Sequence, residues 1–430
     1  MSAAGPPRGA NASSEGQVVA RNKPIAELSL HEPVARNRLS RAAGAAASEG
    51  LGPAAPTLLA QLWTANRGEA SRESRPARPG ELNEVNDRGG KIQRRPVHGV
   101  LLLDKPLGLS SNQALQKAKW LLRAEKAGHT GTLDPLATGV LPLCFGAATK
   151  FSQLQLDADK TYEATLVLGQ KTTTGDAEGE VIETRPVPDI TPQLLEELTR
   201  RFTGAMTQIP PMYSALKKDG KALYEYARRG EEIEREPRAI VIYKLNMALN
   251  QAGRAQAAIK ITATCSKGTY IRTLGEDIGE AIGCGAHLGS LRRIETGGFV
   301  EADCITLSAL EALGESARLQ RLLQPQILVA AFPVVTLDAD NAGRFLSGLR
   351  RRGKPGQWGV DAAMVQVFGP SPMAESADQV DAFLGSAHVT ADELIPQRLL
   401  SPIEIGDIAK ARVAGTAKPE SPGLTSAFSQ

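Results

Sequence analysis

An aspartate followed by a proline lies in a glycine-rich segment, residues 128–139 (GHTGTLDPLATG). Pro135 pushes the backbone of Asp134 towards an extended conformation, which would hold a short carboxylate still on a loop. The three glycines of the segment indicate tight turns or backbone held close to a ligand. A carboxylate between Leu133 and Leu136 needs a cation or several donors to remain ionised. Held in this way, it could serve as a nucleophile or act by electrostatics.

The same segment also fits a purely structural turn, in which the carboxylate bonds to nearby amides. A phosphate-binding loop is not expected, because the GK[ST] spacing is absent. A metal site is not expected either, because cysteines and histidines are scattered without CxxC, HxH or HExxH spacing. They are Cys144, Cys265, Cys284 and Cys304, and His31, His98, His129, His287 and His388. The cysteine pattern favours reduced, mostly buried thiols in a cytoplasmic protein.

The elements around this segment predict a mixed α+β domain. Residues 99–103 (GVLLL) form an apolar run that suits a buried strand, and Ser110 or Ser111 can cap a helix through about Ala124. Residues 161–168 alternate and are predicted to form a strand. Further predicted elements are a helix from Thr191-Pro192 to about Phe202, strands at 239–248 and 256–265 with a turn around Gly253, and helices after Arg272 and Leu307.

Length and composition allow two or three domains in the 430 residues. Residues 1–96 are rich in Ala, Gly, Ser, Pro and Arg, and are predicted to be a disordered extension or an over-extended reading frame. A large domain is expected at 97–330, a small, mostly β domain at 331–408 and a disordered tail at 409–430. No apolar run approaches the roughly 18 residues of a membrane span. The net charge of +3 neither demands nor excludes a nucleic-acid partner.

Taken together, the motifs resemble those of the TruB family of tRNA pseudouridine synthases. The resemblance covers roughly residues 97–300 and also includes a terminal segment typical of bacterial members. It rests on GHTGTLDPLATG, GVLLLDKP, ADKTYEATLVLG, GDAEGE (175–180), PPMYSALKKDGKALYEY (210–226), CSKGTYIRT (265–273), HLGSLRR (287–293) and FLGSAHVTADELIPQRL (383–399). It implies a mixed, mostly antiparallel sheet with flanking helices, followed by a small β-rich PUA-like domain.

The resemblance assigns the chemistry to three residues. Asp134 is the catalytic carboxylate, Arg272 is its cation, and Tyr162 stacks on the target uracil or handles the proton lost at C5. Residues 269–272 (TYIR) are β-prone, so Tyr270 and Arg272 are expected on one face of a strand. Without the resemblance, Arg272 would be read as a surface partner of Glu276, and Tyr162 as a core aromatic.

Five further positions match substrate-binding residues of the family. His129 is expected where the flipped nucleotide leaves its stack, and Asp176 is expected to contact nucleic acid near the site. Leu291 is expected to line the uracil pocket, Tyr270 to face the site, and Lys105 to support the loop. Each has a plainer interpretation, such as a turn carboxylate for Asp176 or a core leucine for Leu291.

The resemblance also implies the substrate and partners. The expected reaction isomerises the uridine at position 55 in the T loop of tRNA, without cofactor, metal or guide RNA, by a monomer. Residues 210–238 carry basic side chains among tyrosines and are expected to grip the T arm, although a solvated, mixed-charge helix is the plainer interpretation. Three alternatives remain open: a guide-RNA-dependent synthase, an RNA-binding or RNA-folding protein, and a metal-dependent hydrolase.

Overall fold

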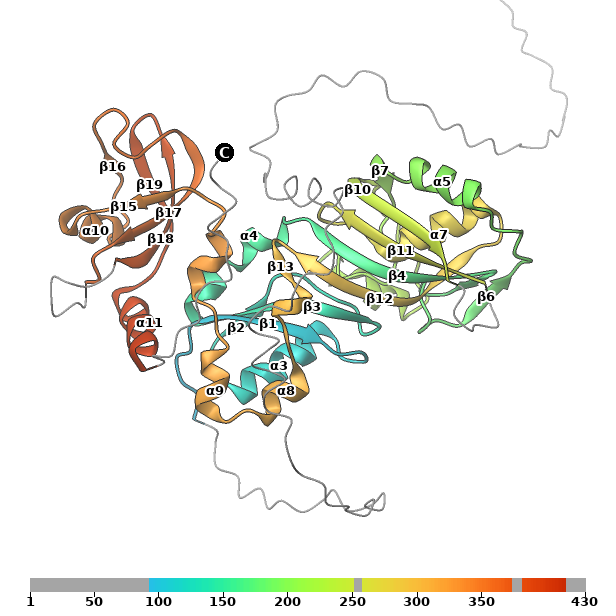
Figure 1. Cartoon of the computed structure of the whole chain (residues 1–430), viewed down its shortest axis with the longest axis horizontal. Helices are drawn as coiled ribbons and strands as arrows, with labels where there is room; N and C mark the ends of the chain where they lie inside the picture. Colours follow the sequence, from blue (N-terminus) through green and yellow to red (C-terminus); the bar gives the residue numbers. More distant parts are fainter. Residues whose placement is uncertain (1–92, 251–256, 373–380, 415–430) are drawn as a thin grey trace, which may run out of the picture. The chain divides into compact units, whose positions relative to one another are not determined.

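The computed structural model describes residues 93–250, 257–372 and 381–414. Its largest element is a ten-stranded sheet in the order β14-β1-β3-β12-β4-β11-β10-β7, with β13 paired to β12 and β2 to β3 (Figure 1). The β1–β14 and β3–β12 pairs are parallel and the other pairs are antiparallel. The prediction of a mixed, mostly antiparallel sheet is therefore confirmed.

The strands of this sheet are β1 (Gly99–Lys105), β2 (Ala127–His129), β3 (Ala137–Phe145), β4 (Lys160–Leu168), β7 (Gly204–Gln208), β10 (Arg238–Leu249), β11 (Ala258–Cys265), β12 (Ala286–Thr296), β13 (Phe299–Val300) and β14 (Ile305–Thr306). Two hairpins stand apart from it: β5 (Gln170–Thr172) with β6 (Val181–Thr184), and β8 (Lys217–Lys218) with β9 (Lys221–Ala222). The turn expected around Gly253 lies outside the described residues.

The helices before the second sheet are α3 (Ser111–Leu121), α4 (Ser152–Leu156), α5 (Pro192–Arg201), α6 (Leu223–Ala227), α7 (Ile271–Ile282), α8 (Leu307–Ala312) and α9 (Glu315–Gln320), with short 3-10 turns at Gly146–Lys150, Glu301–Asp303 and Pro325–Val329. Ser110 caps α3 with a capping box closed by Gln113, and Thr191 caps α5 with Pro192 in the first turn. Both predicted helix starts are confirmed.

Successive side chains along a strand point to opposite faces of the sheet, and both faces are buried. On β1, Leu101 and Leu103 face a core shared with helices α3, α5, α7 and α8, whereas Val100 and Leu102 belong to a second core. Helix α7 packs on β12 and β4 within the first core (Figure 1). Gly279 permits this packing, because a Cβ there would lie 2.3 Å from the Ala286 amide nitrogen.

The C-terminal part forms a five-stranded sheet in the order β15-β17-β18-β19-β16. Its elements are β15 (Val334–Thr336), α10 (Ala339–Leu346), β16 (Arg351–Arg352), β17 (Ala362–Gly369), β18 (Ala382–Thr390), β19 (Glu393–Leu399) and α11 (Pro402–Ala414). The mostly β character expected of this region is confirmed. The small domain is predicted to end near Ile408, but helix α11 continues to Ala414. Residues 1–92 of the extension predicted at 1–96, and residues 415–430 of the tail predicted at 409–430, lie outside the described residues.

Candidate active site

The glycine-rich segment forms a loop, residues 130–136, between β2 and β3. It is anchored to α3 by the buried Ser111, whose hydroxyl accepts from the Leu133 amide at 2.7 Å and donates to the Leu133 carbonyl at 3.0 Å. The Asp134 carbonyl accepts from the Ala137 amide at 3.1 Å. Hydrogen bonds on both sides thus hold Asp134 in place. The sequence offers Ser110 and Ser111 as caps of α3. Ser110 is the cap, so the hydroxyl of Ser111 is available to bind Leu133.

Asp134 is paired with Arg272, as the family resemblance implies. Arg272 Nη2 lies 2.9 Å from Asp134 Oδ2, and the guanidinium also donates to the carbonyls of Thr174 at 3.1 Å and Tyr213 at 2.6 Å. The arginine is 5% exposed, whereas the Asp134 side chain is 40% exposed. The cation is therefore fixed from three directions, and the carboxylate it holds stays accessible.

The strand predicted for residues 269–272 is wrong. Tyr270 is the N-cap of α7 and Arg272 lies in its first turn, so the two do not share a strand face. The helix prevails because Ile271, Leu274 and Ile278 recur at helical spacing and are all buried against the sheet. The alternative of a surface partner for Glu276 is also wrong, because Arg272 is buried.

Burial and charge act on the Asp134 carboxyl in opposite directions. Burial is the largest influence and raises its pKa, and the nearby Asp176 carboxylate raises it further. The Arg272 guanidinium lowers the pKa by attraction and by a hydrogen bond, and Lys105 lowers it as well. The ionised form of Asp134 therefore depends on these cations.

Lys105 supports the loop, as expected. Its ammonium group is fully buried and donates to the carbonyl oxygens of Pro106 at 2.9 Å and Pro135 at 3.4 Å, and also to that of Leu109. Burial lowers its pKa to about 8, against the attraction of Asp134. The contact with Pro135, the residue after the aspartate, ties β1 to the loop that carries Asp134.

Asp176 lies on the other side of Arg272. Its Oδ2 is 3.6 Å from Arg272 Nη1, while Oδ1 accepts from the Thr174 hydroxyl at 2.6 Å and the Glu178 amide at 3.1 Å. The residue is 3% exposed. Asp176 thus has the turn role of the plainer interpretation and also lies beside the Asp134–Arg272 pair.

Tyr270 is positioned through its backbone. The Gln208 side chain accepts from the Tyr270 amide at 2.8 Å and donates to the Tyr270 carbonyl at 3.0 Å. Burial raises the pKa of the half-buried phenol. The Asp134 charge acts on this phenol too, so Tyr270 faces the same site.

Tyr162 and Leu291 enter the site from neighbouring strands. Tyr162 on β4 and Leu291 on β12 are each 9% exposed, and both belong to the main core. Burial raises the pKa of the Tyr162 phenol, and a hydrogen bond from Arg293 opposes this rise. The core interpretations of both residues hold, while Tyr162 also lies within electrostatic reach of Asp134.

His129 lies at the end of β2, where the loop begins. Its Nδ1 is 3.4 Å from the Gly131 amide, which donates to it. Burial lowers the imidazole pKa and the Arg293 charge lowers it further, so the ring is neutral near pH 7.

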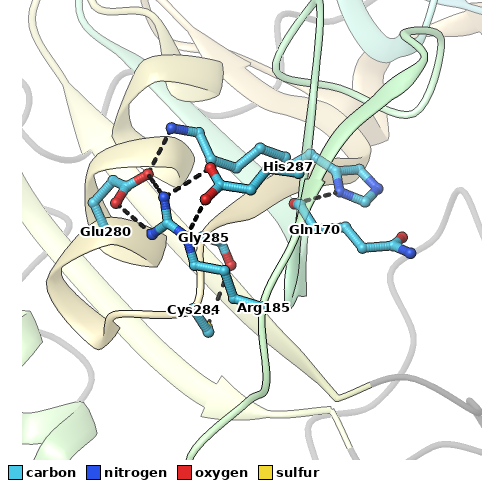
Figure 2. A network of polar contacts seen from close by, with 8 residues as sticks. Gln170, Arg185, Glu280, Cys284, Gly285 and His287 are labelled. Carbon is cyan, nitrogen blue, oxygen red and sulfur yellow. Dashed lines mark hydrogen bonds and ion pairs between the residues drawn. The ribbon is translucent and has the colours of Figure 1, made fainter.

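A network of ion pairs holds the β5–β6 hairpin against α7 (Figure 2). Arg185 binds Glu280 of α7 at 2.8 Å and Glu183 at 2.6 Å, and Lys171 of β5 binds Glu280 at 2.6 Å. His287 Nδ1 adds a contact to the Gln170 carbonyl at 3.0 Å. The network matters for the site because the loop of this hairpin carries the Thr174 carbonyl and Asp176, both in contact with Arg272.

Sequence reasoning missed four residues of this site or its support. Arg293 lies in the motif HLGSLRR, but only Leu291 of that motif was assigned a role. Gln208 and Glu280 lie outside the sequence motifs on which the family resemblance rests. Glu178 belongs to GDAEGE, and its carboxyl has a pKa raised by burial and by Asp176 and Asp134, which places it at the site's edge. Motif membership was the available signal for the first and last of these.

The basic segment 210–238 is not one helix. It contains the β8–β9 hairpin and the five-residue α6, and its exposed cations include Lys217, Lys221 and Arg228. The Arg228 guanidinium lies 5.2 Å from the Tyr224 ring centre. The hairpin corrects the solvated-helix interpretation and leaves the tRNA-gripping role as a prediction.

In the described part of the chain, no helix has the length and apolar character needed to cross a membrane. Among the same residues, His, Cys, Asp and Glu side chains do not gather in groups of three or more that could hold a metal ion.

Comparison with known proteins gives matches along the region that carries this site. The family model described as TruB family pseudouridylate synthase (N terminal domain) matches residues 119–271, and that of the tRNA pseudouridylate synthase B C-terminal domain matches residues 272–327. The chain is 61% identical over 320 residues to tRNA pseudouridine synthase B of Verminephrobacter eiseniae, covering 74% of this chain and 93% of the relative. It is 53% identical to that of Ralstonia pickettii, covering 72% and 96%.

Solved structures share the fold at lower sequence identity. A Cbf5-Nop10-Gar1 complex contains a chain that is 22% identical with a TM-score of 0.51, covering 76% of this chain and 94% of that one. The archaeal box H/ACA sRNP Nop10-Cbf5 complex contains one that is 20% identical with a TM-score of 0.50, covering 76% and 95%. At these identities the likeness concerns the fold.

Proposed function

The chain belongs to the TruB family of pseudouridylate synthases, and on that premise we propose that it converts the uridine at position 55 in the T loop of tRNA, with Asp134 as the essential carboxylate. The observation that carries the proposal is the pair between Asp134 and the buried Arg272, at 2.9 Å on an anchored loop. The coarser activity, isomerisation of tRNA uridine, follows from family membership.

The reaction needs one well-placed carboxylate and no exchange of atoms with a cofactor. The N1–C1′ bond breaks, the uracil rotates, and C5 joins C1′; the C5 proton is lost and N1 gains a proton. A carboxylate can attack the nucleotide covalently or stabilise the cationic sugar that forms when the base departs. Arg272 keeps Asp134 ionised and fixes its orientation, while the exposed part of the carboxylate faces the substrate.

A base inside a folded RNA must leave its stack to reach this carboxylate. Tyr162 offers a ring beside Asp134 on which the uracil can stack, and Leu291 on the adjacent strand supplies an apolar wall. His129, neutral at the start of the loop, is placed to contact the nucleotide without adding charge.

Binding of the T arm is assigned to the exposed cations of residues 210–238. Lys217, Lys221 and Arg228 project from a hairpin and a short helix, and the carbonyl of Tyr213 at the base of this segment bonds to Arg272. Phosphate contacts from such cations supply salt-sensitive affinity that does not depend on Asp134. We therefore expect binding and chemistry to be separable.

The test is site-mapped pseudouridine formation on an unmodified tRNA transcript, without guide RNA or cofactor. Wild type should convert the T-loop uridine, whereas Asp134→Asn should lose at least about 10³-fold in kcat and still bind tRNA. A transcript with cytidine at position 55 is the matched control. Activity in Asp134→Asn would overturn the role of Asp134. Activity that appears only with added guide RNA, or none from folded wild type, would overturn the stand-alone T-loop assignment.

A further inference from the structure

Arg293 is a fully buried arginine, 1% exposed, on β12. Among the residues that the structure describes, it forms no ion pair with a carboxylate. Its neighbour Arg292 is the ordinary case: that side chain is 35% exposed and binds Asp104 at 3.0 Å and Glu301 at 2.8 Å. A buried guanidinium without an acidic partner is costly, so its retention calls for a reason beyond packing.

Its contacts join three elements of the site. Arg293 Nε donates to the Val140 carbonyl of β3 at 2.8 Å, and Nη2 lies 3.4 Å from the Gly131 carbonyl in the catalytic loop. The guanidinium also lies near enough to the phenol of Tyr162 for its positive charge to lower the pKa of that phenol. One side chain thus contacts the strand after the loop and the loop itself, and acts on the tyrosine opposite it in the sheet.

Strand register fixes these contacts. Arg293 is directly opposite Tyr162 in the antiparallel β12–β4 pair, so both side chains leave the sheet on the same face. On its other side, β12 approaches β3 at Gly139, where a Cβ would lie 2.2 Å from the Arg293 carbonyl oxygen. The backbone of Arg293 is therefore held between β4 and β3.

We propose that Arg293 is a positioning residue for the isomerisation, which orients the Tyr162 phenol and holds the Gly131 side of the loop that carries Asp134. The inference rests on the proposed function. Because Arg293 lies opposite Tyr162 in the sheet, its guanidinium can restrict the ring plane against which the flipped uracil stacks. The planar guanidinium can donate in three directions at once, which a lysine ammonium cannot do with the same geometry.

The experiment is a double-mutant cycle on the full chain with Arg293→Lys, Tyr162→Phe and the combined variant. Each single variant is expected to lower kcat by about 10–100-fold with KM changed less than about threefold, because misplacement of the reacting groups slows chemistry more than binding. The combined variant should be no worse than about threefold below the slower single variant, because both changes break one interaction. Arg292→Lys, next in sequence but outside the site, is the control and should retain wild-type kcat.

Multiplying effects in the combined variant, or a loss confined to KM, would overturn the inference. If Arg293→Lys fails to fold by circular dichroism, Arg293→Gln takes its place in the cycle. Full kcat in Tyr162→Phe would reject the inference, whereas a loss in the arginine variant that largely disappears in the Tyr162→Phe background would support it. Failure of wild type to convert the T-loop uridine would instead reject the proposed function, so the two failures are distinguishable.

Discussion

The two ends of α7 each carry a charge of the sign that a helix dipole disfavours. Arg272 lies in the first turn, at the positive end, and Glu280 lies in the last turn, at the negative end. Arg272 is 5% exposed and contacts two carboxylates and two carbonyls, whereas the Glu280 side chain is 42% exposed and binds Arg185 and Lys171. Neither charge is placed to stabilise the helix itself, so in both cases the partners explain the position.

The difference between the ends lies in the surroundings. Removing one member of a buried charge cluster leaves the others without a partner in a poorly solvated place, whereas water replaces a lost partner at the surface. We therefore expect changes at the Arg272 end to affect catalysis and stability together. Changes at the Glu280 end should affect mainly how firmly the β5–β6 hairpin is held.

Among changes that compare the two ends of α7, the largest effect is expected for Arg272→Gln. It leaves Asp134 and Asp176 without the guanidinium that pairs with both, so kcat should fall by at least about 10²-fold and the free energy of unfolding by about 3 kcal/mol. Urea unfolding and site-mapped conversion measure the two quantities. Arg185→Gln, at the exposed end, is the matched control. Equal losses of kcat and of unfolding free energy in Arg272→Gln and Arg185→Gln would contradict the expected difference between the two ends.

The pH dependence of activity should reflect the Arg272 end of α7, which pairs with Asp134, and should not depend on the Glu280 end. Burial raises the Asp134 pKa above 3.8, its ordinary value. Protonation removes both the nucleophilic charge and the attraction to Arg272, so activity should be lost as pH falls through this raised pKa. The acid limb of kcat/KM, measured from about pH 4 to 8, should therefore have its midpoint above 3.8.

The Glu280→Gln variant is the control for this profile, because the exposed network does not contact Asp134 directly. Its acid limb should coincide with that of wild type, provided circular dichroism shows both proteins folded over the range. A wild-type midpoint at or below 3.8 would contradict the assigned influence of burial.

An effect of intermediate size is expected for Gly279→Ala, at the glycine where α7 packs against the backbone of Ala286 on β12. The added Cβ would meet the Ala286 backbone at 2.3 Å, so α7 must shift on the sheet. We expect a loss of about 1–3 kcal/mol in the free energy of unfolding, with a fall in kcat because Arg272 moves with the helix. Gly343→Ala in α10 meets nothing within 4 Å and should be neutral or slightly stabilising. A stable Gly279→Ala variant with unchanged kcat would show that the helix position tolerates adjustment.

The smallest effect is expected for Glu280→Gln. Its ion pairs are solvent-exposed, so the Tm should change by no more than about 3 °C and kcat by less than about twofold. Thermal unfolding at low and high salt checks this, since added salt should weaken the wild-type network and narrow the difference. A large loss of activity would instead indicate that the network holds Thr174 and Asp176 in place for Arg272.

Local features of the site were accessible from sequence. The glycine-rich loop with Asp134, the cap at Thr191 and the alternating strand around Tyr162 each depend on residues within a few positions of one another. The strand predicted at Tyr270 and Arg272 is wrong because the helix predicted after Arg272 begins earlier, at Ile271, and includes Arg272. Burial of Ile271, Leu274 and Ile278 against the sheet decided for helix.

The sequence by itself determined the family, the type of fold and the carboxylate on which the chemistry is proposed to depend. The tertiary structure decided which charges meet: Arg272 with Asp176 as well as Asp134, and Arg293 with Tyr162 and Gly131. The physical reason is that a residue's type and near neighbours set its local conformation, whereas the partner of a buried charge depends on strand register and helix packing. These bring together residues that lie far apart in the chain.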